Sequence, residues 1–308
     1  MLHDENEIRK DDIVIYYTHY PNQFISHPKL GKRIVSLLHF YGIKEDCLKI
    51  SDIQPDVLFT AADLRKYSKL YKKNLDDLAC NYLLLPFVYE ERFRITVPFK
   101  ERKNKAMAIG TVTYFKNEEF KKMYSTYCYQ PLRKQIYDNK ERLSRYIDCY
   151  IMPYKEDREK EVKTGDNIFL RSYYWIVNHF NNSQRKYFSF DMVDKFNEYK
   201  IAICPEDAQG MPGIGFVEAM ASGCAFLGLK YGAYEDLGLI EGVHYIAYDG
   251  SITDLRAKIE YYTSQEHQKE LSNIAQNGYE YVKNNFNKEI VAKRFVDYFE
   301  RLLDVNER

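Results

Sequence analysis

Short runs of apolar residues alternate along this chain with stretches in which apolar residues recur at helical spacing. Runs too short for a helix, bounded by Pro, Gly or charged residues, are typical of buried strands. They predict strands within residues 12–21, 56–60, 81–89, 105–113, 201–204 and 225–229. Apolar side chains that recur every three or four positions predict helices over residues 29–41, 61–73, 131–152, 190–199, 216–222, 253–262, 266–284 and 287–303. Strands that alternate with helices indicate an α/β fold with parallel sheets.

This alternation is interrupted near residue 100. Residues 90–105 are charged and contain Pro98, which is typical of a connector. We therefore expect two α/β halves, residues 1–100 and 101–308, and we expect the last helix to pack in the core and back onto the first half. The charged residues 154–166 predict a solvated loop, and residues 232–236 predict another loop.

Residues 201–229 carry the most informative pattern. The strand at 201–204 is followed by a loop with Gly210, Gly213 and Gly215, then by a helix that Gly223 ends, then by a second strand. Strand, glycine loop (residues 205–215), helix and strand form a βαβ unit. In such units the loop lies where α/β sheets bind nucleotides.

Composition narrows the function classes. Lys plus Arg equals Asp plus Glu at 45 each, so no net charge draws the chain to nucleic acid or to anionic lipid. The six cysteines show no zinc-like spacing, which predicts a reducing, cytoplasmic setting. The charged N-terminus is unlike a signal peptide, and no apolar run is long enough to span a membrane. Any association with the inner face of a membrane would have to be peripheral.

The helix after the glycine loop, Val217-Glu-Ala-Met-Ala-Ser-Gly223, and the apolar strand behind it form a motif with a familiar setting. It resembles the donor-nucleotide site of GT-B-fold glycosyltransferases, in particular the retaining group 1, family 4-like enzymes. The preceding helix and strand (190–205), the following loop (231–235) and the terminal helices (273–303) are similar to that family in the same order. The resemblance covers roughly residues 105–308.

The resemblance implies a fold and a domain division. The fold would be GT-B-like, with two Rossmann-like domains and a cleft between them. Residues 1–100 would form an abbreviated acceptor-side domain, and residues 101–308 the domain that binds the nucleotide-sugar. A first domain of this length is short for a Rossmann-like unit, so either it is abbreviated or strands ahead of residue 1 are missing.

The resemblance also implies a reaction. The enzyme would move a sugar from a nucleotide-diphosphate sugar to a glycan or lipid-linked acceptor, in cell-surface polysaccharide or lipopolysaccharide synthesis, with retention of configuration. No Asp-x-Asp occurs, so neither a metal nor another cofactor is expected. By resemblance Glu218 holds the ribose. The residues expected beside the diphosphate and sugar are Gly213, Ile214, Gly215 and Phe216, with Gly110 and Thr111 as a second phosphate turn and Arg171 and Lys230 as candidate cations.

The catalytic side departs from the family pattern. The family places another Glu eight positions before the second, but Gly210 stands there. Either the loop has one extra residue and Gln209 takes that place, or Glu206 reaches in to contact the sugar. His19, at the end of the first strand, is the candidate that faces the donor sugar from the first half, and His27 is the second choice.

Two other interpretations stay open. A GT-B-fold epimerase or phosphorylase would act on the same sugar class, and turnover without an acceptor would identify an epimerase. A non-catalytic GT-B-fold partner subunit would bind the donor without transferring the sugar. The absence of a GxGxxG after an early strand, with an acidic residue some 20 positions on, argues against a nicotinamide enzyme. The sequence does not predict the base, the sugar, the acceptor or the oligomeric state.

Overall fold

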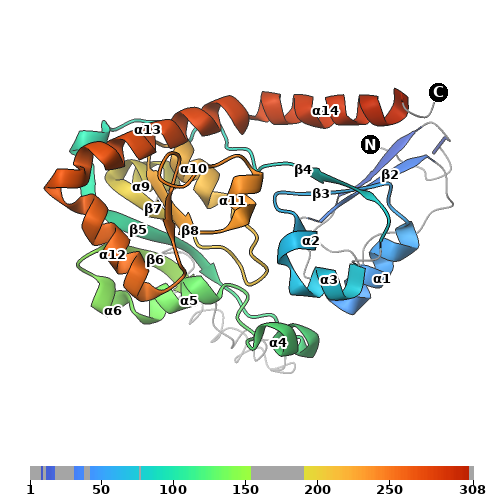
Figure 1. Cartoon of the computed structure of the whole chain (residues 1–308), viewed down its shortest axis with the longest axis horizontal. Coiled ribbons are helices and arrows are strands. Elements are labelled where there is room, and N and C mark those ends of the chain that lie inside the picture. The colour runs from blue at the N-terminus through green and yellow to red at the C-terminus, as the bar shows by residue number, and fades with distance from the viewer. Residues whose placement is uncertain are drawn as a thin grey trace, which may run out of the picture.

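The structure is a computed structural model, and it describes residues 8–9, 12–17, 31–37, 42–75, 78–153 and 191–304. The candidates His19, His27 and Arg171 and the charged run at 154–166 lie outside the described residues. Within them the chain forms two parallel sheets, each with its own helices (Figure 1).

The first sheet has the strand order β1-β2-β3-β4, and every pair in it is parallel. One face packs on short helices around a core that includes Leu58, Leu64 and Tyr71. Its elements in chain order are β1 (Ile13–Tyr16), β2 (Lys32–Ser36), α1 (Lys44–Ile53), β3 (Val57–Thr60), α2 (Leu64–Tyr67), α3 (Lys69–Leu75) and β4 (Asn81–Leu84).

The second sheet has the order β6-β5-β7-β8-β9, again parallel throughout. Its strands are β5 (Lys103–Val112), β6 (Ile147–Pro153), β7 (Tyr199–Ile203), β8 (Ala225–Leu229) and β9 (Ile246–Tyr248). Its helices are α4 (Glu118–Tyr124), α5 (Pro131–Asp138), α6 (Lys140–Leu143), α9 (Met192–Glu198), α10 (Gly215–Ala221), α11 (Gly232–Asp236), α12 (Ile252–Thr263) and α13 (Gln268–Asn285), with short 3-10 turns at Phe99–Glu101 and Gln265–His267.

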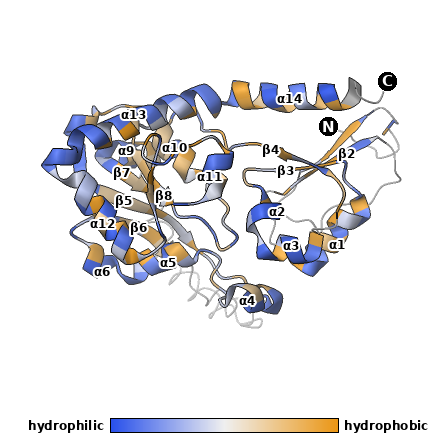
Figure 2. Cartoon of the chain, in the orientation of Figure 1, coloured by the Kyte–Doolittle hydropathy of each residue, from blue (hydrophilic) through white to orange (hydrophobic). Residues whose placement is uncertain are grey.

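Helices cover both faces of the second sheet, which is why its central strands are apolar on both sides. Every residue of β7 is buried. Ala202 packs on the face covered by α9 and α10, whereas Ile201 and Ile203 pack on the face covered by α5 and α12. Figure 2 shows this arrangement, with apolar strands inside and helices that are polar on their outer surfaces.

In the part of the chain that the structure describes, two segments cross between the two sheets. The first crossing is the extended connector at residues 85–98, and the second is the junction of α13 with α14 (Lys288–Asp304). In Figure 1, α14 runs from the second half out over the first sheet. There Phe299 and Phe295 pack against Ile34, Val57 and Phe59, on the face of the first sheet opposite to α1 and α3.

Three predicted elements were wrong. Of residues 29–41, predicted as a helix, the structure describes 31–37, and these contain the strand β2. The β-branched Ile34 and Val35 are both fully buried, on opposite faces of the sheet, and β2 pairs with β1 and β3. Burial on both faces therefore overrides the helical spacing of the neighbouring leucines. The helix in this region, α1, begins only after Gly42, whose φ is 73°.

The helix predicted over residues 131–152 stops early. Its first part is α5 and α6, but Ile147 and Ile151 belong to β6. A spacing of four positions puts two side chains on one face of a strand as well as of a helix, so this pattern did not distinguish the two. Residues 232–236, predicted as a loop, form α11. The predicted α/β class with parallel sheets is confirmed.

Candidate functional site

The strand order of the second sheet defines one crevice. From β5 the chain moves to the edge strand β6 on one side, and β7 lies on the other side of β5. In open α/β sheets, ligands bind at this kind of switch point, outside the carboxyl ends of the two strands. Gly110 and Thr111 lie near the end of β5, and the glycine loop follows β7. The structure therefore brings together two segments that the sequence proposed separately.

Arg133 lies between these two segments. It comes from the first turn of α5, where Pro131 suits the helix start. Its Nε donates to the carbonyl oxygen of Pro205 at 3.0 Å, and its Nη1 donates to that of Thr111 at 3.2 Å. The guanidinium thus bridges the carboxyl ends of β5 and β7, and part of its donor capacity remains for a ligand.

The two glycines make room for this guanidinium. A Cβ at Gly110, whose φ is 130°, would lie 2.9 Å from Arg133 Cδ and Nε, and a Cβ at Gly213 would lie 3.1 Å from Nη2. Sequence reasoning missed Arg133. The only local signal was its place in the first turn of a helix that follows the Gly110 strand, and nothing in the sequence shows that its side chain folds back over the strand ends.

Glu218 lies on α10, directly after the glycine loop. Burial raises its pKa to about 7; Arg92 on the connector opposes this rise, and Glu90 adds to it. Near neutral pH this carboxyl group is therefore present in both its protonated and its ionised form, whereas an ordinary surface glutamate is ionised.

The other predicted donor residues divide into two groups. Ile214 is 46% exposed, and Gly215 packs closely on Cys204, where a Cβ would lie 3.1 Å from Sγ. Phe216, in contrast, is fully buried against the rings of Phe226 and Tyr234. Phe216 therefore fixes α10 to the core, whereas Gly213 lies beside Arg133 and Ile214 is exposed to solvent.

Glu206 is fully buried at the carboxyl end of β7. Its Oε1 accepts hydrogen bonds from the Leu229 N–H at 3.2 Å and from the Tyr234 hydroxyl. Its Oε2 is buried and has no hydrogen-bond partner among the described residues. Burial raises the pKa of this carboxyl group. Glu206 thus ties the ends of β7 and β8 together, and a neutral carboxyl is favoured there.

Gln209 is also buried, and both ends of its amide are engaged. Oε1 accepts from the Ser68 hydroxyl at 2.8 Å, and Nε2 donates to the Tyr129 hydroxyl at 3.1 Å. Ser68 belongs to the first half of the chain, between α2 and α3. Gln209, one of the two alternatives for the place of the family's first Glu, therefore contacts the other half of the protein.

The candidate cation Lys230 does not reach the crevice. Its side chain is 68% exposed, and Nζ pairs with Glu241 Oε2 at 3.0 Å. Within the described residues, no group of three or more His, Cys, Asp or Glu side chains could hold a metal ion, and no helix is long and apolar enough to cross a membrane.

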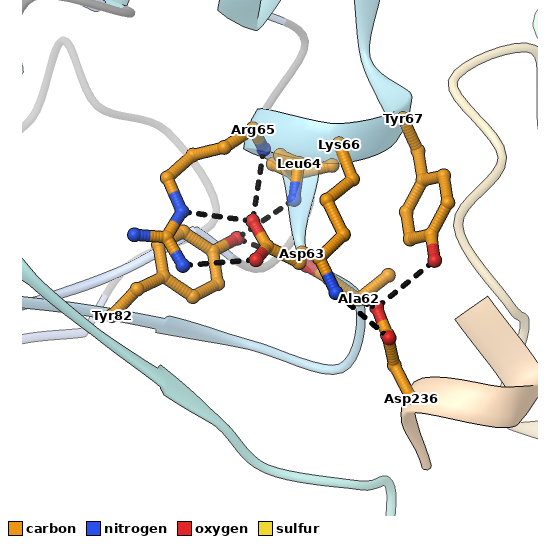
Figure 3. A network of polar contacts seen from close by, with 8 residues as sticks. All are labelled: Ala62, Asp63, Leu64, Arg65, Lys66, Tyr67, Tyr82 and Asp236. Atoms are coloured by element: carbon orange, nitrogen blue, oxygen red, sulfur yellow. Dashed lines mark hydrogen bonds and ion pairs between the residues drawn. The ribbon is translucent and has the colours of Figure 1, made fainter. Parts of the chain in front are cut away.

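The first half also contacts the turn after β8. Lys66 Nζ donates to Asp236 Oδ1 at 2.8 Å, and the Tyr67 hydroxyl donates to Oδ2 at 2.9 Å (Figure 3). Tyr67 further packs its ring on Tyr231, with centroids 4.6 Å apart. On the other side of α2, Asp63 caps the helix and binds Arg65. Helix α2 thus contacts α11 and the residue before it through polar groups and packed rings.

Comparisons with known proteins show the fold. No protein-family model matches the sequence, and no curated protein matches it either. Among solved structures, sucrose-phosphate synthase from Thermosynechococcus elongatus is similar with a TM-score of 0.54 at 12% identity, covering 92% of this chain and 70% of that one. A glycosyltransferase from Rickettsia africae is similar with a TM-score of 0.52 at 11% identity, covering 89% and 71%.

HepE from Anabaena, solved in complex with UDP and glucose, is similar with a TM-score of 0.52 at 9% identity, covering 88% of this chain and 72% of that one. These structural neighbours are GT-B glycosyltransferases. The chain therefore has the GT-B-like fold that the sequence predicted, with two Rossmann-type parallel α/β units.

Proposed function

We propose that this protein is a glycosyltransferase that uses a nucleotide-diphosphate sugar as donor. The single observation that carries the proposal is the position of Arg133 at the switch point, between Gly110 and Gly213 and bonded to both strand ends. A half-buried guanidinium beside glycine backbone is a suitable receptor for a diphosphate, because Arg offers paired donors that match phosphate oxygens.

Each part of the donor then has a partner of suitable chemistry. Arg133 and the backbone N–H groups of the glycine loop hold the diphosphate, and Glu218 accepts hydrogen bonds from the ribose hydroxyls. The same guanidinium stabilises the negative charge that builds up on the departing diphosphate. The structures of HepE in complex with UDP, with UDP and glucose, and with UDP-glucose support this donor class.

The finer features of the proposal follow the family resemblance. They are a reaction with retention, no metal or other cofactor, an acceptor that is a glycan or lipid-linked sugar of a cell-surface polysaccharide, and a division into an acceptor-side domain (1–100) and a donor domain (101–308). A cytoplasmic location stays a prediction from the free cysteines.

The proposal is tested by nucleotide binding. Thermal-shift screening of nucleoside diphosphates and nucleotide-sugars should find one that raises the melting temperature, because a ligand that binds only the native state stabilises it. Arg133→Ala should then weaken the binding of that nucleoside diphosphate by about 10- to 100-fold in calorimetry, the amount expected for losing a hydrogen bond from a charged group. The affinity for the phosphate-free nucleoside should stay the same.

Lys230→Ala is the matched control, since it removes an exposed cation that pairs with Glu241, and it should bind like wild type. If Arg133→Ala binds the nucleoside diphosphate as tightly as wild type, the diphosphate assignment is wrong. If no nucleotide stabilises the wild type, the proposed function itself is wrong.

A second candidate is a non-catalytic GT-B-fold subunit. One observation favours it: Glu206 and Gln209, the two alternative candidates for the donor-sugar contact, are both buried and hydrogen-bonded inside the protein. A partner subunit would bind the donor and transfer no sugar. Release of nucleoside diphosphate from the best donor, measured with and without glycan acceptors, separates the two functions.

A further inference from the structure

The glycine loop is anchored to the first half of the chain by both apolar and polar contacts. Met211 is buried in the core of the first half, against a cluster that includes Leu37 and Tyr71. Leu70 packs in a second cluster with Tyr129 and with Ala208 of the loop. The glycine loop, although it follows a strand of the second sheet, therefore contributes side chains to the core of the first half.

At the centre of this contact lies a chain of hydrogen bonds. The Ser68 hydroxyl is fully buried; it accepts from the Tyr71 N–H at 3.1 Å and donates to Gln209 Oε1 at 2.8 Å. Gln209 Nε2 donates to the Tyr129 hydroxyl at 3.1 Å, and that hydroxyl donates in turn to the Asp207 carboxylate.

The chain ends in the backbone of the glycine loop. Asp207 Oδ1 accepts from the N–H of Gln209 at 2.8 Å and of Met211 at 3.0 Å, which closes the turn that leads to Gly213. Gly210, with a φ of 77°, sits in this turn directly under the Tyr231 hydroxyl. The hydrogen bonds that begin at Ser68 therefore set the path of the backbone toward Gly213 and the crevice.

We propose that Ser68 is a positioning residue, which through Gln209 couples the placement of the first half to the shape of the glycine loop and thereby to nucleotide affinity. The nucleotide part of this inference rests on the proposed function. In physical terms, the side chain at position 209 holds the loop in its binding shape from the other half of the protein. An arrangement of the halves that breaks the Ser68–Gln209 bond also loosens the turn from Asp207 to Met211.

A matched pair of variants tests the hydroxyl itself. Ser68→Thr and Ser68→Val add nearly the same volume to a fully buried site, and only Thr keeps the hydroxyl. We expect Ser68→Val and Ser68→Ala to bind the best nucleoside diphosphate about fivefold more weakly than wild type, as for one buried hydrogen bond. Ser68→Thr should bind about twofold or less more weakly than wild type. Equal affinities of the Thr and Val variants would overturn the coupling.

A control and a second measurement separate this inference from the proposed function. Lys73→Ala removes an ion pair with Glu119 between the same two halves, away from the glycine loop, and should leave nucleotide affinity unchanged. Hydrogen exchange without any ligand reports directly on the loop: the Gln209 and Met211 amides should exchange faster in the Val and Ala variants than in the Thr variant.

That exchange result decides the inference even if no nucleotide binds the wild type. Unchanged exchange at these two amides in Ser68→Val would overturn the coupling while leaving the donor site intact. Faster exchange in a protein that binds no nucleotide would keep the Ser68 contact and refute only the donor assignment.

Discussion

At the scale of single residues, the carboxyl groups of Glu206 and Glu218 differ in burial and therefore in role. Burial raises the pKa of both Glu206 and Glu218. Glu206 is fully buried and bonds to Leu229 and Tyr234, so it holds the ends of two strands together. Glu218 is only partly buried, and its pKa of about 7 leaves it able to change charge at physiological pH. Of the two, Glu218 is suited to a ligand.

This pKa predicts a pH dependence of nucleotide binding. If the Glu218 carboxylate accepts the ribose hydroxyls, binding requires the ionised form, so affinity should rise with pH through 7. Since roughly a tenth of the groups are ionised one unit below the pKa and most are ionised one unit above, affinity should increase by about tenfold between pH 6 and pH 8. Calorimetry with the best nucleotide at several pH values measures this rise.

The Glu218→Gln variant is the control for this dependence. This variant has no carboxyl group at position 218, so it should bind the nucleotide weakly at every pH and lack the rise in affinity through pH 7. The stability of the free protein should follow the opposite sign: the folded state keeps the proton between about pH 4.5 and 7 while the unfolded chain loses it, so this group's contribution to stability falls as pH rises through that window. If nucleotide affinity depends on pH in the same way in wild type and in Glu218→Gln, Glu218 is not the ribose ligand.

At the scale of elements, one arginine joins the connector to the second sheet. Arg102 was expected to be part of a charged linker, yet it is almost fully buried. Its guanidinium donates to the carbonyl oxygens of Val97 and Ser222 and to Asn197 Oδ1, each at 2.9 Å. Asn197 Oδ1 also accepts the N–H of Thr96 at 2.8 Å. The connector, α9 and the end of α10 therefore share one set of polar contacts.

Removing Arg102 should therefore destabilise the whole second half. Arg102→Ala leaves several buried acceptors without a donor, and we expect the free energy of unfolding to fall by about 3 kcal/mol or more. Urea denaturation measures this. Lys103→Ala is the neighbouring control, because Lys103 pairs with Glu198 at the surface and such pairs contribute only about 0–1 kcal/mol. Equal losses in the two variants would show that the Arg102 contacts are not the cause.

The elements also show what the sequence could predict. The glycine loop and its flanking strands were found correctly, because their turn residues and apolar runs are local signals. The strands β2 and β6 were missed because their apolar spacing also fits a helix, and only pairing within a sheet decides between the two. Arg133 and Ser68 were missed for a similar reason. Each makes its hydrogen bond to a residue far away in the sequence, so no local pattern indicates the contact.

At the scale of the whole molecule, the first half is not an independent unit. Its sheet has helices α1 and α3 on one face, and the other face is covered by α14, which comes from the end of the chain. Phe299 is buried there beside Ile34 and Val57, and Figure 2 shows apolar residues alternating with polar ones along α14. The glycine loop adds Met211 to the opposite core. The first half therefore completes both of its cores with segments of the second.

This arrangement predicts that a destabilising substitution in α14 lowers the local stability of the first sheet. Phe299→Ala removes a large buried side chain, which typically costs about 3–5 kcal/mol, and the cavity lies against β2 and β3. Hydrogen exchange should show faster exchange of the β2 and β3 amides, while β7 and β8 keep their protection. Val296→Ala, on the exposed side of the same helix, should change neither. Equal loss of protection in both sheets would mean that the molecule unfolds as a single unit, and that α14 does not stabilise the first sheet separately.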